Sequence, residues 1–327
     1  MINPNGATAY YIRAILGSLN IHTAEGKQNI CIFSNRRSGS TLLMQMIYSQ
    51  PGIKSVDQPL DPWRYNPYNK IFRGIYENKI FLKDRNHLNR LEKYFTDVVF
   101  RGKLKGYSQW NYFDNNYKLF SDRLVVKILN ALPFLDWFEE NFDIRIIYLV
   151  RHPIPTSLSI IRRNWGNFVE YLLHNPYIIN KYLNEKKLNY SFQILENGTN
   201  LEKFVLEWCL HNLYPLSVYN DRNWLTITYE ELLLRPIEMV DLICNYLDLP
   251  DRNKMLESIL KPSKTTSKKS KKDIIERGPS YLIKNWEKNI DENLESKTMK
   301  ILEELKIKAY MKGNIFPSKE LTHFGSF

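Results

Sequence analysis

Residues 30–43, which read ICIFSNRRSGSTLL, constrain the fold more than any other part of the chain. A short apolar run enters a polar loop that contains Gly39, and apolar residues then return at helical spacing. The pattern predicts a buried strand, a tight loop and the first turn of a helix. The first N–H groups of a helix have no partner within it and carry partial positive charge, so this junction is a candidate phosphate site.

The loop residues suit an anion. Gly39 lets the backbone approach closely, and the other candidates add hydroxyl donors or positive charge: Arg36, Arg37, Ser38, Ser40 and Thr41. The loop is not a Walker A motif, because it has no Gly-Lys pair and no second glycine at the required spacing. A kinase or NTPase is therefore disfavoured, and the alternative is an arginine-rich loop that caps an ordinary helix through Ser38 or Ser40.

Composition sets broad limits on the fold and the partners. The 327 residues are 43% hydrophobic, which is enough for one elaborated α/β domain. The formal charge of +11 favours anionic partners, so nucleic acid, phospholipid head groups and phosphorylated small molecules all stay open. Six of the eleven excess charges come from a lysine run at residues 261–272, which we expect to be a flexible loop.

Cysteine usage and the N-terminus favour a cytoplasmic protein. Cys31, Cys209 and Cys244 are sparse and lie in apparent core segments, so neither a disulfide framework nor a metal site is expected. Residues 1–30 contain no continuous apolar stretch of the kind found in signal peptides, and no run of eighteen apolar residues occurs in the chain. We therefore expect no targeting or transmembrane segment.

Strands and helices alternate along the chain. Buried strands are expected at 30–33, 124–128, 144–150 and 224–229, with helices near 10–19 and 230–247 and after the first and third strands. Residues 64–120 and 164–200 read as helical insertions, and the proline-rich residues 55–63 read as an irregular loop. Such alternation with long crossovers predicts a parallel sheet flanked by helices on both faces.

A second candidate anion site follows the third strand. Arg151 ends the strand, and Ser159 lies eight residues later in the next helix, so both side chains can grip one phosphate if the loop folds back. A structural ion pair is the plainer explanation for a single arginine at a strand end. Two strand-end anion sites in one parallel sheet together suggest a ligand with phosphates at two ends.

These residues carry a resemblance to a known family. Residues 36–43 (RRSGSTLL) resemble the 5'-phosphosulfate loop of the sulfotransferases that use 3'-phosphoadenylyl sulfate (PAPS), and Arg151 with Ser159 resembles their 3'-phosphate motif. Residues 228–232 (TYEEL) are similar to a late strand-to-helix segment of the family, and Arg277, Gly278 and Trp286 to its C-terminal segment that closes over the nucleotide. The resemblance covers about residues 29–63, 122–163 and 202–290.

The resemblance implies a P-loop NTPase-like sulfotransferase fold with helical insertions, as a single domain over residues 1–327. Within it, residues 29–63 hold the 5'-phosphosulfate loop and residues 261–290 close over the nucleotide. The helical insertions at 64–120 and 164–200 then lie on the acceptor side. It implies an O-sulfotransferase in which PAPS is the co-substrate and leaves as PAP, without a metal. The acceptor is a hydroxyl on a carbohydrate, a lipid or a small alcohol or phenol, and neither the acceptor nor the oligomeric state can be read from the sequence.

The same resemblance suggests catalytic roles. Arg37 and Lys127 are expected to stabilise negative charge on the leaving phosphate, as fixed cations do in phosphoryl transfer. Many bacterial members of the family place a Glu-Pro pair where this chain has Gln58, and an amide cannot act as a base. Asp57 and Asp61 are therefore the candidate bases, with Asp57 slightly ahead.

Two other functions remain open at this point. One is a PAP-binding protein without catalysis, in which Gln58 marks a lost base. The other is a basic nucleic-acid-binding protein, although the lysine run has no aromatic residue among its cations and so predicts only nonspecific, salt-sensitive contact.

Overall fold

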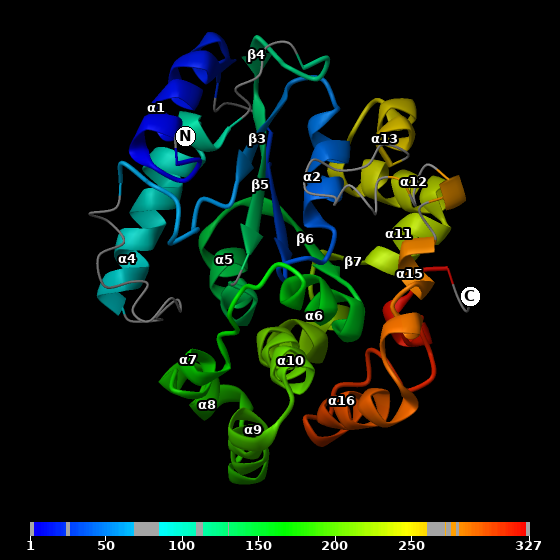
Figure 1. The fold of residues 1–327 in the computed structure, drawn as a ribbon. Coiled ribbons are helices and arrows are strands. Elements are labelled where there is room, and N and C mark those ends of the chain that lie inside the picture. Colours follow the sequence, from blue (N-terminus) through cyan, green and yellow to red (C-terminus); the bar gives the residue numbers. More distant parts are fainter. Residues whose placement is uncertain are drawn as a thin grey trace.

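The computed structural model describes residues 3–23, 27–68, 85–108, 114–129, 131–259, 272, 276–278 and 281–324 (Figure 1). A five-stranded parallel sheet in the order β3-β5-β2-β6-β7 forms the centre. Its strands are β2 (Asn29–Ser34), β3 (Ile53–Asp57), β5 (Arg123–Leu129), β6 (Ile144–Val150) and β7 (Leu225–Thr228). A separate parallel pair joins β1 (Ile21–His22) to β4 (Phe120–Ser121).

Helices cover both faces of the sheet, so the residues of its central strand, β2, are buried on both sides. In Figure 1, α2, α12 and α13 lie on one side of the sheet, and α4 and α5 lie on the other. The helices are α1 (Ala7–Leu16), α2 (Ser40–Tyr48), α4 (Arg85–Tyr94), α5 (Leu135–Asn141), α6 (Pro153–Ile161), α7 (Val169–Leu173), α8 (Pro176–Tyr182), α9 (Glu185–Asn197), α10 (Asn200–Val218), α11 (Tyr229–Leu234), α12 (Pro236–Leu247), α13 (Arg252–Ile259), α15 (Tyr281–Lys284) and α16 (Glu292–Glu304). Short helical turns include Gly17–Leu19, the π-helical Phe95–Val99 and Lys105–Tyr107.

Aromatic packing joins the sheet to one helical layer. Phe33 of β2 meets Phe138 of α5 edge-on, with ring centroids 5.0 Å apart, and Phe138 meets Phe95 at 5.1 Å. On the other face, Leu43, Met46 and Ile47 of α2 are fully buried. These contacts belong to one continuous hydrophobic core that extends from the N-terminal helix to the C-terminal segment.

The sheet order places the candidate site. β2 is the central strand, with β5 on one side and β6 on the other, so the carboxyl ends of all three meet at one edge. Ligands of open α/β sheets bind at this edge, beside the strand where the connections change direction. The loop after β2, Lys127 near the end of β5 and Arg151 after β6 therefore come together.

The predicted parallel sheet with helices on both faces is confirmed, and so are the strands at 30–33, 124–128 and 144–150. The prediction of an irregular loop over residues 55–63 is wrong in its first part. Residues 53–57 form β3, which pairs with β5 at the edge of the sheet, so the sheet has a fifth strand. The prolines did not prevent this, because Pro59 and Pro62 lie beyond the strand's end.

Smaller differences have local causes. The predicted helix 230–247 is divided at Arg235, because Pro236 cannot continue α11 and instead begins α12. The fourth strand ends at Thr228, which caps α11 through its hydroxyl. Residues 64–120 include the short strand β4 in addition to helices. No helix among the described residues is long and apolar enough to span a membrane.

Candidate active site

The loop between β2 and α2 has the geometry of an anion cradle. Gly39 lies just before α2 with φ 92°, a left-handed conformation that glycine adopts without strain. The ring of Tyr229 lies so close that a Cβ on Gly39 would be 2.3 Å from it. The hydroxyl of Ser38 is buried and has no hydrogen-bond partner among the described residues, so this loop holds a polar donor that is available to a ligand.

The two motifs that are distant in sequence meet at this loop. Arg37 Nε donates to Ser159 Oγ at 3.0 Å, and Arg151 Nη1 donates to the Arg37 carbonyl oxygen at 3.2 Å. The guanidinium of Arg151 also lies over the Tyr229 ring, 4.4 Å from its centroid. One residue of the first motif thus contacts both residues of the second.

The electrostatics of this meeting point favour a bound anion. Burial, followed by the charges of Arg163 and Arg151, lowers the pKa of Arg37 to about 10. Arg162 acts in the same direction. Like charges held this close are unfavourable for each other, and a multiply charged anion among them relieves the repulsion.

A buried network fixes Arg151 and the start of α6. The Arg151 carbonyl accepts a hydrogen bond from Trp208 Nε1 at 3.0 Å, and the N–H of His152 donates to Glu230 Oε1 at 3.0 Å. The His152 ring caps α6 and stacks on Trp286 with centroids 4.8 Å apart. Burial lowers the pKa of His152 to about 3, so this ring is neutral and serves to position its neighbour.

Arg36, which the sequence predicts to bind the donor, makes its closest contact with a residue of α10. Its guanidinium pairs with Glu207 Oε1 of α10 at 2.5 Å and lies 4.3 Å from the ring centroid of Phe168. The N–H of Phe168 donates to the second oxygen of Glu207 at 2.9 Å. Arg36 therefore anchors the loop to α10, because its charge is already balanced inside the protein.

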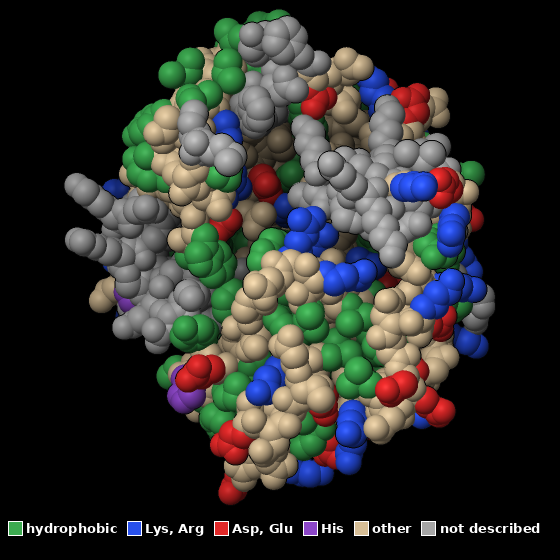
Figure 2. All heavy atoms as spheres, viewed as in Figure 1, with side chains coloured by type: hydrophobic (Ala, Val, Ile, Leu, Met, Phe, Trp, Pro, Cys, Tyr) green, Lys and Arg blue, Asp and Glu red, His purple; other side chains and the backbone are tan. Residues whose placement is uncertain are grey.

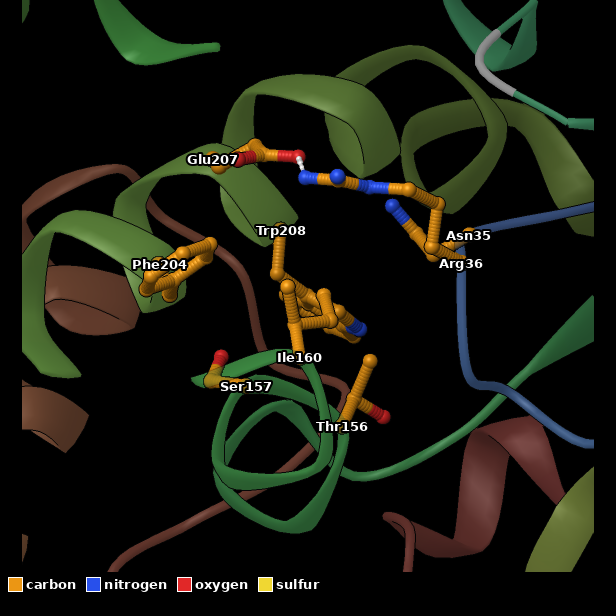
Figure 3. A pocket seen from close by; sticks show the side chains of 8 residues that line it. All are labelled: Asn35, Arg36, Thr156, Ser157, Ile160, Phe204, Glu207 and Trp208. Carbon is orange, nitrogen blue, oxygen red and sulfur yellow. Dashed lines mark hydrogen bonds and ion pairs between the residues drawn. The ribbon is translucent and has the colours of Figure 1, made fainter. Parts of the chain in front are cut away.

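A small cavity lies beside this ion pair. Figure 3 shows Arg36 and Glu207 facing one another above α6, which contributes Thr156 and Ser157. The cavity volume is about 10 Å³, which is close to the space of one water molecule. It is lined by Asn35, Arg36, Thr156, Ser157, Ile160, Phe204, Glu207 and Trp208. A nucleotide does not fit in this space.

Lys127 and Asp57 form a second polar group next to α2. The two residues are opposite one another in the β3–β5 register, so their side chains share one face of the sheet. Lys127 Nζ lies 2.7 Å from Asp57 Oδ1 and donates to Thr41 Oγ1 at 3.1 Å. Lys127 therefore links the cradle to the segment that carries the candidate bases.

The two candidate bases differ in their surroundings. Burial raises the pKa of Asp57, but Lys127 and then Arg64 outweigh it, so the pKa is held below its usual value. Burial raises the pKa of Asp61 above its usual value. Gln58 lies between them in a left-handed conformation, with φ 56°, and its N–H donates to the Lys127 carbonyl at 2.9 Å.

The C-terminal candidates are only partly at the site. Trp286 is buried against His152, next to Arg151. Arg277 is exposed and lies over the Tyr281 ring at 4.7 Å, and Gly278 has φ 79°. Of the lysine run at 261–272, all but Lys272 lie outside the described residues.

Sequence reasoning missed the residues that support the cradle. Tyr229 covers Gly39, Glu207 holds Arg36, and Arg163 adds charge beside Arg37. Residues 228–232 (TYEEL) were recognised only as a strand-to-helix segment, which gave Tyr229 no role at the site. Glu207 offers a clearer signal, because an acid inside the apolar pattern of a buried helix requires a buried cation as its partner.

A family model and several solved structures resemble this chain. The family model described as "Sulfotransferase family" matches residues 29–253. Among solved structures, the chain is similar to the sulfotransferase domain of the curacin biosynthetic pathway, at 19% identity and TM-score 0.47, covering 86% of this chain and 98% of that one. It is similar to the sulfotransferase domain of the Synechococcus PCC 7002 olefin synthase at 18% identity and TM-score 0.44, covering 87% of this chain and 98% of that one. It is also similar to mouse sulfotransferase SULT7A1 complexed with PAP at 15% identity and TM-score 0.43, covering 90% of this chain and 89% of that one.

A search of curated protein sequences finds no significant match. The family model alone spans more than half of the chain, and it includes the cradle, Lys127, Arg151 and Ser159. The chain therefore belongs to the sulfotransferase family.

Proposed function

We propose that this sulfotransferase transfers the sulfuryl group of PAPS to a hydroxyl acceptor. The observation that supports PAPS is the convergence of Arg37, Arg151 and Ser159 at the N-terminus of α2. PAPS carries a phosphosulfate at one end and a phosphate at the ribose 3' position. The loop that contains Arg37 can bind one charged end of such a donor, and Arg151 with Ser159 can bind the other.

The residues present fit such a donor. The N-terminus of α2, the unpartnered hydroxyl of Ser38 and the left-handed backbone at Gly39 suit the 5'-phosphosulfate. Arg151 and Ser159 suit the 3'-phosphate, since the Ser159 oxygen accepts from Arg37 and its own proton remains available for a phosphate oxygen. Ser40 and Thr41 begin α2 and carry hydroxyls in its first turn.

Arg37 and Lys127 are the proposed electrostatic catalysts. PAPS supplies an activated sulfuryl group whose transfer leaves negative charge on a phosphate oxygen. Arg37 is fixed by Ser159, and Lys127 is fixed by Asp57 and Thr41, so both cations are in place before the reaction. Such preorganised charge contributes more than charge that must reorient. Arg37 has a planar guanidinium and can donate two hydrogen bonds to one group.

Asp61 is the better candidate for the base, although the sequence put Asp57 slightly ahead. Asp57 is held ionised by Lys127 and Arg64, and its lowered pKa makes it a weak proton acceptor. Asp61 has a raised pKa because of its burial, which brings it nearer to neutral pH. We therefore assign proton removal to Asp61 and the positioning of Lys127 to Asp57.

The other predicted donor ligands receive supporting roles in the proposal. Arg36 holds the loop through Glu207, and Trp286 holds the start of α6 through His152. Arg277 and Gly278 remain predicted nucleotide contacts.

Isothermal titration with PAP tests the donor site. We expect the native protein to bind PAP and the double variant Arg37→Ala, Arg151→Ala to lose binding by at least about a hundredfold, because each charge-assisted contact contributes about 1.5–3 kcal/mol. The matched control is Arg222→Ala, Arg252→Ala, which removes the same charge from two surface ion pairs and should bind normally. No binding by the native protein, or equal binding by the first double variant, would refute the proposal.

A transfer assay tests the acceptor class. Incubation with PAPS labelled in the sulfuryl group should give labelled sulfate esters from panels of alcohols or phenols and no labelled sulfamates from a panel of amines. If PAP binds but none of these acceptors or a cell extract becomes labelled, the chain is a binding protein without catalysis. Labelled amines alone would exclude the O-sulfotransferase assignment.

A further inference from the structure

The N-terminal part of the molecule exposes an unusual number of large apolar side chains. Among the described residues, seven of the twelve exposed large hydrophobic side chains lie in residues 11–21 and 119–120. We refer to them as the N-terminal apolar face, which consists of Tyr11, Ile12, Ile15, Leu19, Ile21, Leu119 and Phe120. Figure 2 shows hydrophobic side chains gathered at the upper left and top, where Figure 1 places α1 and β4.

Local structure aligns several members of this face. Tyr11 and Ile15 are four residues apart on α1, so they lie on the same side of the helix, and Leu19 follows in the turn that leads to β1. Ile21 and Phe120 are opposite one another in the β1–β4 pair, and opposite residues of paired strands share a face. Ile15 is 70% exposed and Phe120 is 68% exposed.

The helix α1 is therefore apolar on both sides. Its inner side buries Ala9 and Tyr10, and Tyr10 packs against Tyr65 and Tyr107 with centroids 5.6 Å and 6.1 Å apart. Its outer side presents Ile12 and Ile15 to solvent. Contiguous exposed apolar surface of this kind marks a site of interaction.

The charges around the face favour an anionic occupant. The described residues 3–23 contain no acidic side chain. Arg101 and Lys103 are exposed in the turn at Gly102, which lies against the His22 ring of β1.

The acids of the neighbouring strand segment do not oppose this charge pattern. Asp114 interacts with Lys118, which offsets its charge. Asp122 lies against Gly52, in the turn before β3.

The same charges disfavour a second copy of this chain. In a dimer through this face, Arg101 and Lys103 of both copies would lie at one interface and repel each other, and each chain carries a formal charge of +11. Surfaces that combine exposed apolar side chains with nearby Lys and Arg bind anionic lipid surfaces, where the apolar groups insert and the cations attract the head groups.

We propose that the N-terminal apolar face docks the protein on an anionic lipid surface. Ile12, Ile15 and Phe120 insert among the acyl chains, and Arg101 and Lys103 lie at the level of the head groups. The inner side of α1 contacts Tyr65, and Tyr11 shares a hydrogen bond with Tyr65 at 3.1 Å. The docked face therefore lies next to the segment that carries Asp57 and Asp61. The proposal does not depend on the donor or on catalysis.

Vesicle sedimentation tests the proposal. We expect the native protein to pellet with vesicles of phosphatidylcholine mixed with phosphatidylglycerol, and much less with phosphatidylcholine alone. The double variant Ile15→Glu, Phe120→Glu should lose at least about tenfold in partition, because it removes two inserting side chains. Both positions are exposed, so the fold should be retained, as circular dichroism can check.

A matched control separates the face from the overall charge. The variant Ile237→Glu, Met311→Glu adds the same two negative charges at exposed apolar positions elsewhere, where Ile237 is 63% and Met311 is 58% exposed. It should partition within about twofold of the native protein. Equal losses in both double variants would show that only net charge matters and would overturn the proposal. It is also overturned if the native protein does not pellet, or if sedimentation velocity shows a dimer that only the first variant abolishes while vesicle binding is unchanged.

Discussion

Lys54 gives the sharpest test of the energetics of this fold. It lies in β3 with 0% of its surface exposed, and its Nζ has no hydrogen-bond partner among the described residues. Burial, followed by the charge of Lys105, lowers its pKa from 10.5 to about 8. A pKa shift of one unit corresponds to 1.36 kcal/mol, so keeping the Lys54 side chain charged costs the folded state about 3 kcal/mol.

The sign of the pH dependence follows from the direction of this shift. The folded-state pKa lies below the unfolded-state value, so the cost is fully present below about pH 8 and disappears as the pH rises towards 10.5. We expect Lys54→Met, which keeps the length and removes the charge, to raise the free energy of unfolding by up to about 3 kcal/mol at pH 7. The advantage should shrink between pH 8 and 10.5.

Urea unfolding of the native protein and the Lys54→Met variant, at a series of pH values, measures this difference. Lys103→Met is the matched control, because Lys103 is exposed and its replacement should change stability little at any pH. The reasoning is refuted if Lys54→Met is no more stable than the native protein at pH 7, or if its advantage does not depend on pH.

Three further substitutions test the site. Gly39→Ala puts a Cβ 2.3 Å from the Tyr229 ring and strains a φ of 92°, so PAP titration should show at least about tenfold weaker binding. Glu207→Ala leaves the buried Arg36 without its partner, and urea unfolding should show a loss of about 3 kcal/mol. Asp61→Asn should lower the transfer rate about a hundredfold or more while PAP affinity stays within about twofold. Because burial raises the pKa of Asp61, native activity should fall as the pH drops through a value above that of an ordinary aspartate.

Each of these expectations has a contradictory outcome. Native affinity in Gly39→Ala would mean that Tyr229 moves freely, and native stability in Glu207→Ala would mean that solvent reaches Arg36. If Asp57→Asn abolishes the acidic limb of the rate profile and Asp61→Asn does not, Asp57 is the base after all.

Local patterns along the chain predicted much of this fold. Apolar runs of strand length are at β2, β5 and β6, and the polar loop with one glycine is at the start of α2. These features depend on neighbouring residues, so periodicity and turn chemistry reveal them. The sequence also shows that both anion motifs follow predicted strands. Because a parallel sheet brings the carboxyl ends of its strands to one edge, the two motifs could be expected to lie close together.

Strand pairing could not be predicted in the same way. The prolines at 59 and 62 led to the prediction of an irregular loop over residues 55–63, yet residues 53–57 pair with β5 and form an edge strand. This register places Asp57 opposite Lys127 and creates the ion pair that lowers the pKa of Asp57. The preference for Asp61 as the base follows from that contact.

The sequence by itself determined the class of the protein: the order and spacing of the residues around Gly39, Arg151 and Ser159 indicated a parallel α/β sulfotransferase. Only the tertiary structure decided where the side chains point. It turned Arg36 inward to Glu207 and left the N-terminal apolar face in solvent. The physical reason is that a side chain's direction depends on which distant element packs beside it, and the partner of Arg36, Glu207, lies 171 residues away in the chain.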